Sequence, residues 1–116
     1  MANDADCLFC RIVAGEVPAD VVHRTDTTVA FRDLEPQAPT HVLVVPRRHE
    51  PDAAALAAAE PTVLVDLVAA AAAVAEQDGL AGGYRLVFNT GPDAQQTVFH
   101  VHLHLLGGRS MGWPPG

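Results

Sequence analysis

Three histidines alternate with apolar residues near the C-terminus, and this row limits the local structure more than any other feature. The stretch reads Val98-Phe99-His100-Val101-His102-Leu103-His104-Leu105-Leu106. Successive side chains of an extended chain point to opposite sides, so a strand would gather the histidines on one face and the intervening apolar residues on the other. The alternation therefore predicts a strand over residues 98–106 with one face toward a core and the other free for chemistry.

The spacing of the histidines limits how they can act together. At a rise of about 3.3 Å per residue, His100 and His104 lie roughly 13 Å apart along a strand, too far for all three side chains to bind one metal ion. Ordinary hydrogen-bonded residues of a half-buried strand are the simpler interpretation for a lone histidine. Three histidines at strict period two, followed by Gly107-Gly108, favour separate functional roles.

The composition fits a single α+β domain. The chain has 116 residues, of which 49% are hydrophobic but only 5% aromatic, so alanine-rich helices should cover a small sheet. The net charge of -7, with no basic run beyond Arg47-Arg48, argues against nucleic acids and anionic membranes as partners. No signal peptide or membrane span is evident, because the apolar stretch 63–75 is short and contains Asp66, so we expect a cytoplasmic protein.

Hydrophobic patterns and turn residues place the remaining elements. A hairpin is expected at 21–25 and 28–33, further strands at 40–46 and 84–89, helices at 51–59 and 61–77, and a polar loop at 90–97. His41 begins the buried strand at 40–46, a common place for a site residue. His23, in the first strand of the hairpin, is expected to be a surface residue.

The Cys7-Leu8-Phe9-Cys10 segment opens a short helix and would place two thiols about one turn apart. Such a pair in a reducing compartment is either a redox couple or half of a zinc site. The redox version normally follows a strand, whereas only six residues precede Cys7 here. The sequence therefore favours zinc, provided that two further ligands exist.

The row from His100 to Leu106 matches the signature of the histidine triad superfamily, and other segments resemble its Hint branch. These segments are Phe31-Arg32-Asp33-Leu34, Pro36-Gln37-Ala38-Pro39-Thr40-His41, Pro46-Arg47-Arg48-His49 and the tail from Leu106-Gly107-Gly108-Arg109 to Trp113-Pro114-Pro115-Gly116. The resemblance covers nearly the whole chain as one domain, 1–116, with an N-terminal zinc-binding segment and a C-terminal tail for the dimer and active site. It implies a five-stranded antiparallel sheet with two helices, paired in a homodimer into ten strands.

The resemblance also implies an activity. Hint proteins bind purine nucleotides such as AMP or GMP and hydrolyse nucleoside phosphoramidates and aminoacyl-adenylates through a nucleotide attached to histidine. By the matching positions, His102 is the nucleophile and His104 hydrogen-bonds a non-bridging phosphate oxygen. His41 matches the residue that assists proton delivery to the leaving amine. Imidazole suits this reaction because it is largely neutral near pH 7, and the amine leaves readily only when protonated.

The nucleotide pocket and the metal ligands follow from the same resemblance. Phosphate contacts fall on Asn89 and Thr97, with Gln95 and Gln96 of the same loop as further nucleotide-binding residues. The ribose acceptor falls on Asp33, the walls of the base pocket on Val17, Phe31, Leu34 and Leu43, and a contact near the partner's active site on Trp113. Some bacterial Hint-like proteins bind zinc at positions that here are Cys7, Cys10, His49 and His100. Two thiols and two imidazoles form a closed tetrahedral set, so one structural zinc per chain is expected.

Two positions depart from the family pattern, and several other functions are possible. Gln95 stands where the family often has glycine, and Arg32 stands where animal Hint proteins carry histidine, so turnover or substrate preference can differ. Dinucleoside polyphosphate hydrolysis is the main alternative, but that branch lacks the Trp-Pro-Pro-Gly tail. Nucleotidyl transfer would require an acceptor pocket, and the uridylyltransferases carry glutamine in place of His104. Another alternative is a non-catalytic nucleotide-binding or scaffold protein. A metal-dependent hydrolase that uses His100 and His102 as ligands is less favoured.

Overall fold

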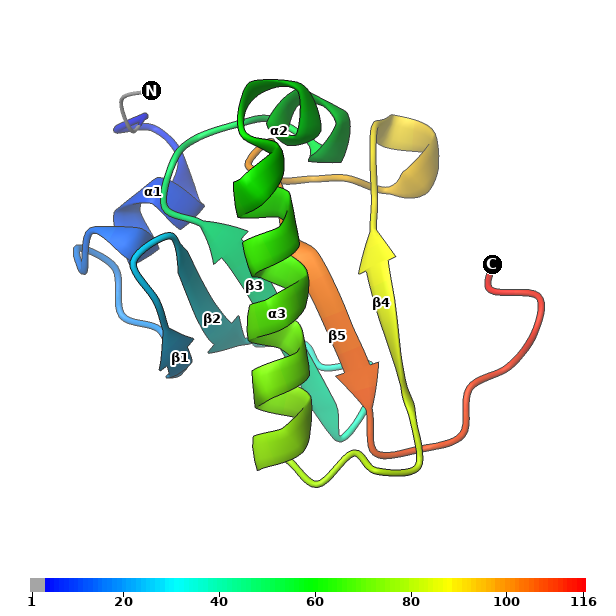
Figure 1. Ribbon diagram of the computed structural model, residues 1–116. Coiled ribbons are helices and arrows are strands. Elements are labelled where there is room, and N and C mark those ends of the chain that lie inside the picture. Colours follow the sequence, from blue (N-terminus) through cyan, green and yellow to red (C-terminus); the bar gives the residue numbers. More distant parts are fainter. Residues whose placement is uncertain (1–3) are drawn as a thin grey trace.

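The computed structural model describes residues 4–116 and contains one five-stranded antiparallel sheet (Figure 1). The strand order is β1-β2-β3-β5-β4, with β1 at Val21–Arg24, β2 at Thr28–Arg32, β3 at Thr40–Pro46, β4 at Tyr84–Phe88 and β5 at Leu103–Gly107. The α+β class and the antiparallel sheet expected from the sequence are confirmed. Residues 1–3 lie outside the described residues. They belong to the N-terminal segment in which no signal peptide was expected.

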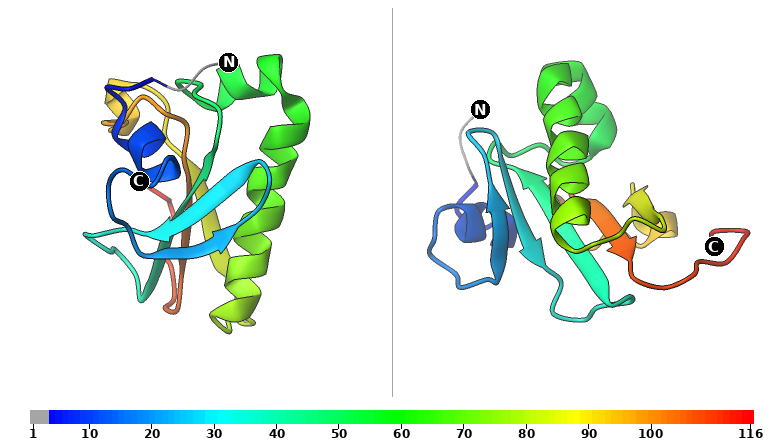
Figure 2. Two further views of the ribbon diagram at one scale, coloured as in Figure 1. Left: turned by 90° about the vertical axis from the view of Figure 1, so that its left-hand side faces the viewer. Right: turned by 60° about the horizontal axis from the view of Figure 1, so that its bottom comes forward.

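Helices lie on both faces of the sheet, as Figure 2 (left) shows. The long α3 (Pro61–Gln77) packs on one face with the shorter α2 (Ala53–Ala59), and α1 (Leu8–Val13) lies on the opposite face. The side chain of Asp52 caps α2 by accepting a hydrogen bond from the backbone N–H of Ala55, and Pro61 occupies the first turn of α3. A short 3-10 turn, η1 (Pro92–Ala94), interrupts the polar loop after β4.

Two apolar clusters fill the two faces. The larger joins Leu67, Ala71 and Val74 of α3 to inward residues of β3 and β5, and the smaller joins Phe9 and Ile12 of α1 to the other face of β2 and β3. None of the helices between residues 4 and 116 combines the length and the hydropathy that a membrane span requires. The face under α1 is also the face on which the candidate site lies.

The prediction of one strand over residues 98–106 is wrong for its first half. β5 begins only at Leu103, whose partners are Val44 in β3 and Phe88 in β4. Upstream of Leu103 the ladder does not continue. Strand β4 ends at Phe88, and the carbonyl of Pro46 at the end of β3 accepts a hydrogen bond from the imidazole of His100 and not from a backbone N–H of the row. Residues 98–102 therefore follow an irregular path.

The apolar side of the row only partly meets the expectation. Val101, Leu103 and Leu105 are buried in the larger cluster, whereas Phe99 is 57% exposed. Phe99 lies in the irregular segment, where the alternation of a strand no longer determines which way a side chain points.

Candidate active site and metal cluster

A hollow of about 400 Å³ on the α1 face gathers most of the residues that the sequence assigned to nucleotide binding. Its lining includes Val17, Phe31, Asp33, Leu34, Leu43, Asn89, Gln95, Thr97, His102 and His104. The volume lies within the range of about 300–1,000 Å³ that is typical of small-molecule sites. The lining combines apolar side chains with polar loop residues and two histidines, which suits a ligand with an apolar ring and a charged group.

Three assigned residues do not line this hollow. The side chain of Gln96 is buried and braces the loop, since its amide donates to the carbonyls of Pro51 at 2.7 Å and Val98 at 3.1 Å. Trp113 is 82% exposed on the C-terminal tail, which projects from the sheet (Figure 1). His41 lies behind His104 and contacts it directly.

Helix α1 contributes pocket residues that the sequence reasoning missed, namely Leu8, Phe9 and Ile12. The ring of Phe9 meets the imidazole of His102 edge to face, with ring centroids 5.1 Å apart. Leu8 and Ile12 are spaced by four residues, which places both on one side of a helix. That spacing beside the cysteine pair was a signal available in the sequence.

His102 presents a free nitrogen lone pair. Its Nδ1 lies 2.8 Å from the carbonyl oxygen of His100, which can only accept a hydrogen bond. Nδ1 therefore carries the proton, and in the neutral ring Nε2 keeps its lone pair. Burial lowers the pKa of His102, so the ring is neutral near pH 7.

A chain of hydrogen bonds fixes the proton positions on the other two histidines. The backbone N–H of Gln37 donates to Nδ1 of His41 at 3.0 Å, so the proton of neutral His41 is on Nε2. This Nε2 lies 2.9 Å from Nδ1 of His104 and donates to it, which leaves the His104 proton on Nε2. Nε2 of His104 is buried and has no partner among the described residues. His104 thus brings an unused hydrogen-bond donor to the hollow.

The electrostatic surroundings keep these rings neutral. Burial, together with neighbouring His102 and His41, lowers the pKa of His104 to about 4. Burial also lowers the pKa of His41, although the Asp33 carboxylate, 3.5 Å from its Nε2, acts in the opposite direction. At neutral pH the three imidazoles carry no charge and keep the proton positions deduced above.

Cys7, Cys10, His49 and His100 form a second cluster, here named the Cys2His2 cluster, whose ligand atoms lie within 4.8 Å of one another. Sγ of Cys10 is 3.4 Å from Nδ1 of both His49 and His100, and Sγ of Cys7 is 3.4 Å from Nδ1 of His100. In a tetrahedral zinc site, bonds of about 2.3 Å to sulfur and about 2.0 Å to nitrogen place such atoms about 3.6 Å apart. The donor set and its spacing therefore fit one zinc ion.

The surroundings of the Cys2His2 cluster fit the same role. Nε2 of His100 donates to the carbonyl of Pro46 at 2.9 Å, which leaves Nδ1 for the metal. Backbone N–H groups of Cys10 and Asp4 point at the sulfurs of Cys7 and Cys10, each at 3.4 Å. Burial raises the pKa of Cys10, so a thiolate there needs a cation to stabilise it.

Asp33, His41 and His104 also bring ligand atoms within 4.8 Å. This set suits a metal less well, because the N–H of Gln37 holds the His41 proton on Nε2, the atom that would have to bind the ion. The proton positions favour a hydrogen-bonded pair.

Arg32 at the pocket edge is engaged by α3. Its guanidinium makes two hydrogen bonds to Asp78, at 2.9 and 3.1 Å, and the hydroxyl of Thr40 donates to the same carboxylate at 2.8 Å. The hydrogen bond from Arg32 lowers the pKa of Asp78. The arginine thus anchors β2 to the end of α3 as well as facing the hollow.

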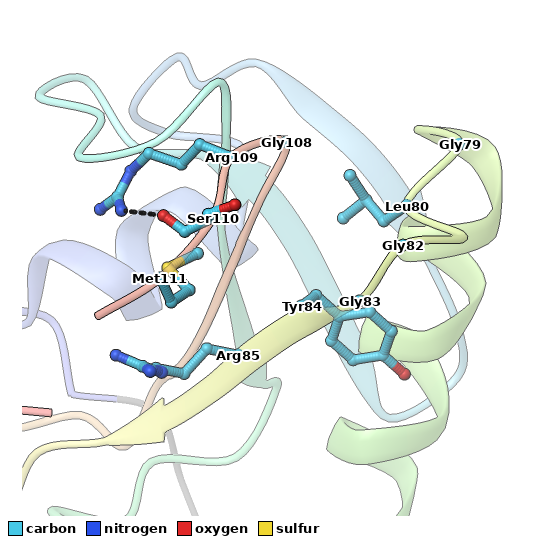
Figure 3. A pocket seen from close by; sticks show the side chains of 10 residues that line it. All are labelled: Gly79, Leu80, Gly82, Gly83, Tyr84, Arg85, Gly108, Arg109, Ser110 and Met111. Atoms are coloured by element: carbon cyan, nitrogen blue, oxygen red, sulfur yellow. Dashed lines mark hydrogen bonds between the residues drawn. The ribbon is translucent and has the colours of Figure 1, made fainter. Parts of the chain in front are cut away.

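A second hollow of about 460 Å³ lies between the loop before β4 and the chain after β5 (Figure 3). It contains no histidine or cysteine. Arg85 donates to the carbonyl of Gly112, and Arg109 donates to the carbonyl of Gln37 through Nε and Nη2. Arg109 therefore supports the loop whose amide fixes the proton of His41.

Comparison with known proteins agrees with this arrangement. A family model described as HIT domain matches residues 14–111. An uncharacterised HIT-like protein of Synechococcus elongatus is 48% identical over 96% of this chain and 97% of its own, and a 14 kDa zinc-binding protein of Zea mays is 45% identical over 98% and 91%. A protein of Arabidopsis thaliana named adenylylsulfatase HINT1 is 43% identical, covering 98% of this chain and 79% of the relative.

Solved structures show the same fold. A HIT family hydrolase from Legionella pneumophila superposes with a TM-score of 0.91 at 46% identity and covers 96% of this chain and all of the other. A histidine triad protein from Clostridium difficile gives a TM-score of 0.91 at 34% identity, covering 96% and 97%. With the family model spanning most of its length and relatives similar over nearly all of it, this chain belongs to the HIT family.

Proposed function

We propose that this protein hydrolyses nucleoside phosphoramidates or aminoacyl-adenylates and releases a nucleoside monophosphate such as AMP or GMP. One observation supports this most: the free Nε2 lone pair of His102 and the unused Nε2–H of His104 belong to the same pocket. A nucleophile and a donor side by side are what a phosphoryl group needs.

In the first step, Nε2 of His102 attacks phosphorus and the P–N bond of a phosphoramidate breaks. The ring then carries a positive charge, which its Nδ1–H shares with the carbonyl oxygen of His100. Nε2–H of His104 donates to a non-bridging phosphoryl oxygen, where negative charge develops. The product is a nucleotide joined to His102.

The leaving amine takes a proton through the hydrogen-bonded pair of His104 and His41. The anionic substrate favours uptake of one proton from solvent by this pair, which passes it to the amine and becomes neutral again. In the second step, water attacks phosphorus, the P–N bond to His102 breaks, and the proton that the water loses returns to solvent. The hydrogen bond from His41 holds the His104 proton on the pocket side before and after this transfer.

The rest of the pocket would hold the nucleotide. Asp33 can accept hydrogen bonds from ribose hydroxyls, and Asn89 and Thr97 can donate to the phosphate. The apolar walls, which include Phe31 and Leu43, would contact the base. Gln95, with a positive φ of 63° at the end of η1, faces the same hollow.

The relatives suggest a second substrate of the same chemical class. The Arabidopsis thaliana relative is named adenylylsulfatase, which points to adenylyl sulfate, another adenylate with a good leaving group on phosphorus. The same attack by His102 would release AMP and sulfate, without the need to protonate an amine. We propose it as the alternative to the phosphoramidate.

We propose that the Cys2His2 cluster holds one zinc ion per chain. Relatives from Zea mays and Brassica juncea carry the name 14 kDa zinc-binding protein. Four protein ligands close the coordination sphere, so the ion would supply structural cross-linking rather than a reactive water. Zinc thiolates suit a reducing compartment such as the cytoplasm, where we expect the protein to work.

We further propose a homodimer. Strand β4 is an edge of the sheet with unpaired backbone groups, and the α3 residues Val65 and Val68 leave 67% and 45% of their surface exposed. A second copy covering both would extend the sheet to ten strands. The exposed Trp113 would then be available to the partner's pocket.

The decisive test compares His102→Ala with His23→Ala, which removes a histidine that does not line the pocket. Both variants are assayed with adenosine phosphoramidate, an aminoacyl-adenylate, adenylyl sulfate and a dinucleoside polyphosphate. We expect AMP release by the native protein and by His23→Ala, and almost none by His102→Ala. Unchanged hydrolysis by His102→Ala contradicts the covalent mechanism, and nucleotide binding without hydrolysis favours a binding protein.

A further inference from the structure

We propose that the Cys2His2 cluster positions the imidazole of His102, so that metal occupancy controls nucleotide binding and turnover. The proposal rests on the function proposed above. Phe9 and the main chain of His100 are the positioning groups, because neither has to touch the reacting atoms.

The sheet provides little support for the position of His102. Residues 98–102 lie outside β5, so ladder hydrogen bonds begin only after this residue. The N–H of Val101 donates to the carbonyl of Glu50 at 2.8 Å, and the amide of Gln96 donates to the carbonyl of Val98. Apart from such isolated bonds, this stretch depends on its side chains for its position.

His100 has two roles, one through its ring and one through its main chain. Its ring belongs to the Cys2His2 cluster, with Nδ1 at 3.4 Å from both sulfurs. Its carbonyl oxygen accepts the 2.8 Å hydrogen bond from Nδ1 of His102, which sets both the ring orientation and the proton position of the nucleophile. Whatever holds the ring of His100 thus also holds the acceptor that prepares His102.

Phe9 lies between the two cysteines of the cluster in the sequence. Its ring packs edge to face on His102 with centroids 5.1 Å apart, and on His100 at 6.0 Å. Helix α1 has only six residues, too few to be stable by itself. Cross-linking through Cys7 and Cys10 would therefore hold both Phe9 and the pocket wall that α1 provides.

These contacts join the cluster to His102 from two sides. Without the metal, the ring of His100 keeps its hydrogen bond to Pro46 and its ring contacts, and α1 keeps its apolar packing, but no coordination bond links the two. We expect the imidazole of His102 to lose its fixed orientation and the pocket to lose a wall, while the sheet and α3 persist. The ion thus controls the site without contacting the substrate.

The experiment compares zinc-loaded protein with protein stripped by 1,10-phenanthroline, with three measurements on each. These are AMP affinity by calorimetry, the His102 Nδ1–H signal in histidine-labelled nitrogen NMR, and the hydrolysis rate. Stripping should weaken AMP binding and slow hydrolysis by at least about tenfold, since misplacing a catalytic group by about 1 Å can cost about 100-fold in rate. The Nδ1–H signal should be lost and should return with zinc. His49→Asn should behave as stripped protein, and His23→Ala as native protein.

Phe9→Leu separates the positioning role from simple unfolding. This variant keeps all four ligands, so it should bind one zinc and retain its β-sheet signal, yet bind AMP more weakly and broaden the His102 resonance. If stripped protein unfolds completely, this variant decides: a zinc-loaded Phe9→Leu protein with native affinity and a native His102 signal overturns the proposal.

Stripped protein that stays folded and keeps both its AMP affinity and the His102 signal also overturns the proposal. If the zinc-loaded protein hydrolyses none of the substrates, the proposed function fails. The His102 signal then still decides the positioning role, because it requires neither substrate nor turnover.

Discussion

Replacing His41 by phenylalanine tests the hydrogen-bonded pair that is proposed to orient His104. The 2.9 Å bond between Nε2 of His41 and Nδ1 of His104 is shielded from water, and His41 is only 6% exposed. Phenylalanine keeps the ring and removes both nitrogens. The His104 proton is then no longer fixed on Nε2, so the donor faces the phosphoryl group only part of the time.

The magnitude lies between two limits. A hydrogen bond of ordinary net strength is worth about 1 kcal/mol, or about fivefold in rate. Complete loss of a donor to a developing oxyanion costs about 3–4 kcal/mol, or roughly 10²–10³-fold. We expect His41→Phe to lower kcat by about 10–100-fold with little change in KM, since the donor matters most in the transition state.

The assay is a double-mutant cycle of His41→Phe and His104→Leu, measured as kcat/KM for adenosine phosphoramidate at pH 7. His104→Leu should cost about 10²–10³-fold. If His41 acts only through His104, the double variant should be no slower than His104→Leu alone. Multiplying effects would refute the reasoning and assign His41 an independent role. Thermal unfolding of each variant checks that the fold is retained.

Three further predictions concern stability, charge and metal. Asp78→Ala should lower the unfolding free energy by about 2–3 kcal/mol, chiefly because the buried Thr40 hydroxyl loses a charged acceptor. Arg32→Gln should lower it by less than about 1 kcal/mol, and urea unfolding at pH 7 measures both values. Because the pKa of Asp78 is below its ordinary 3.8 in the folded state, this contribution is present above that pH and disappears as the pH falls through the folded value. Nitrogen NMR should find His104 neutral down to pH about 4, and a pKa near 6.5 would contradict its burial. Purified protein should contain one zinc per chain with both thiols slow to alkylate, and metal-free protein with reactive thiols would contradict the zinc assignment.

The sequence predicted the sheet well because local patterns and the global fold agree. The strand at 40–46 and the helix at 61–77 were expected with the bounds that the structure has, since proline marks an end of each and apolar residues follow the right period. The start of the row of histidines was wrongly predicted to be part of a strand. The alternation there reflects burial of Val101 in the core and of His100 in the Cys2His2 cluster, and not a continuous ladder.

The candidate site could be predicted only as far as side-chain chemistry shows in a sequence. The row of histidines and the cysteine pair could be recognised from their residue types. The backbone amide of Gln37, which orients His41, leaves no trace in residue type, because every residue except proline has the same N–H. The role of Phe9 was equally hidden, since its position against His102 depends on how α1 crosses the sheet.

The central claim is that His102 becomes covalently attached to the nucleotide. Rapid acid-free quenching of the protein with adenosine phosphoramidate, followed by peptide mass spectrometry, tests it most directly. We expect an adenylyl group on the peptide containing residues 98–106, located on His102 by fragmentation and absent from His102→Ala. AMP formation at full rate with no adenylylated protein at any time, or with the group on another residue, would contradict the account.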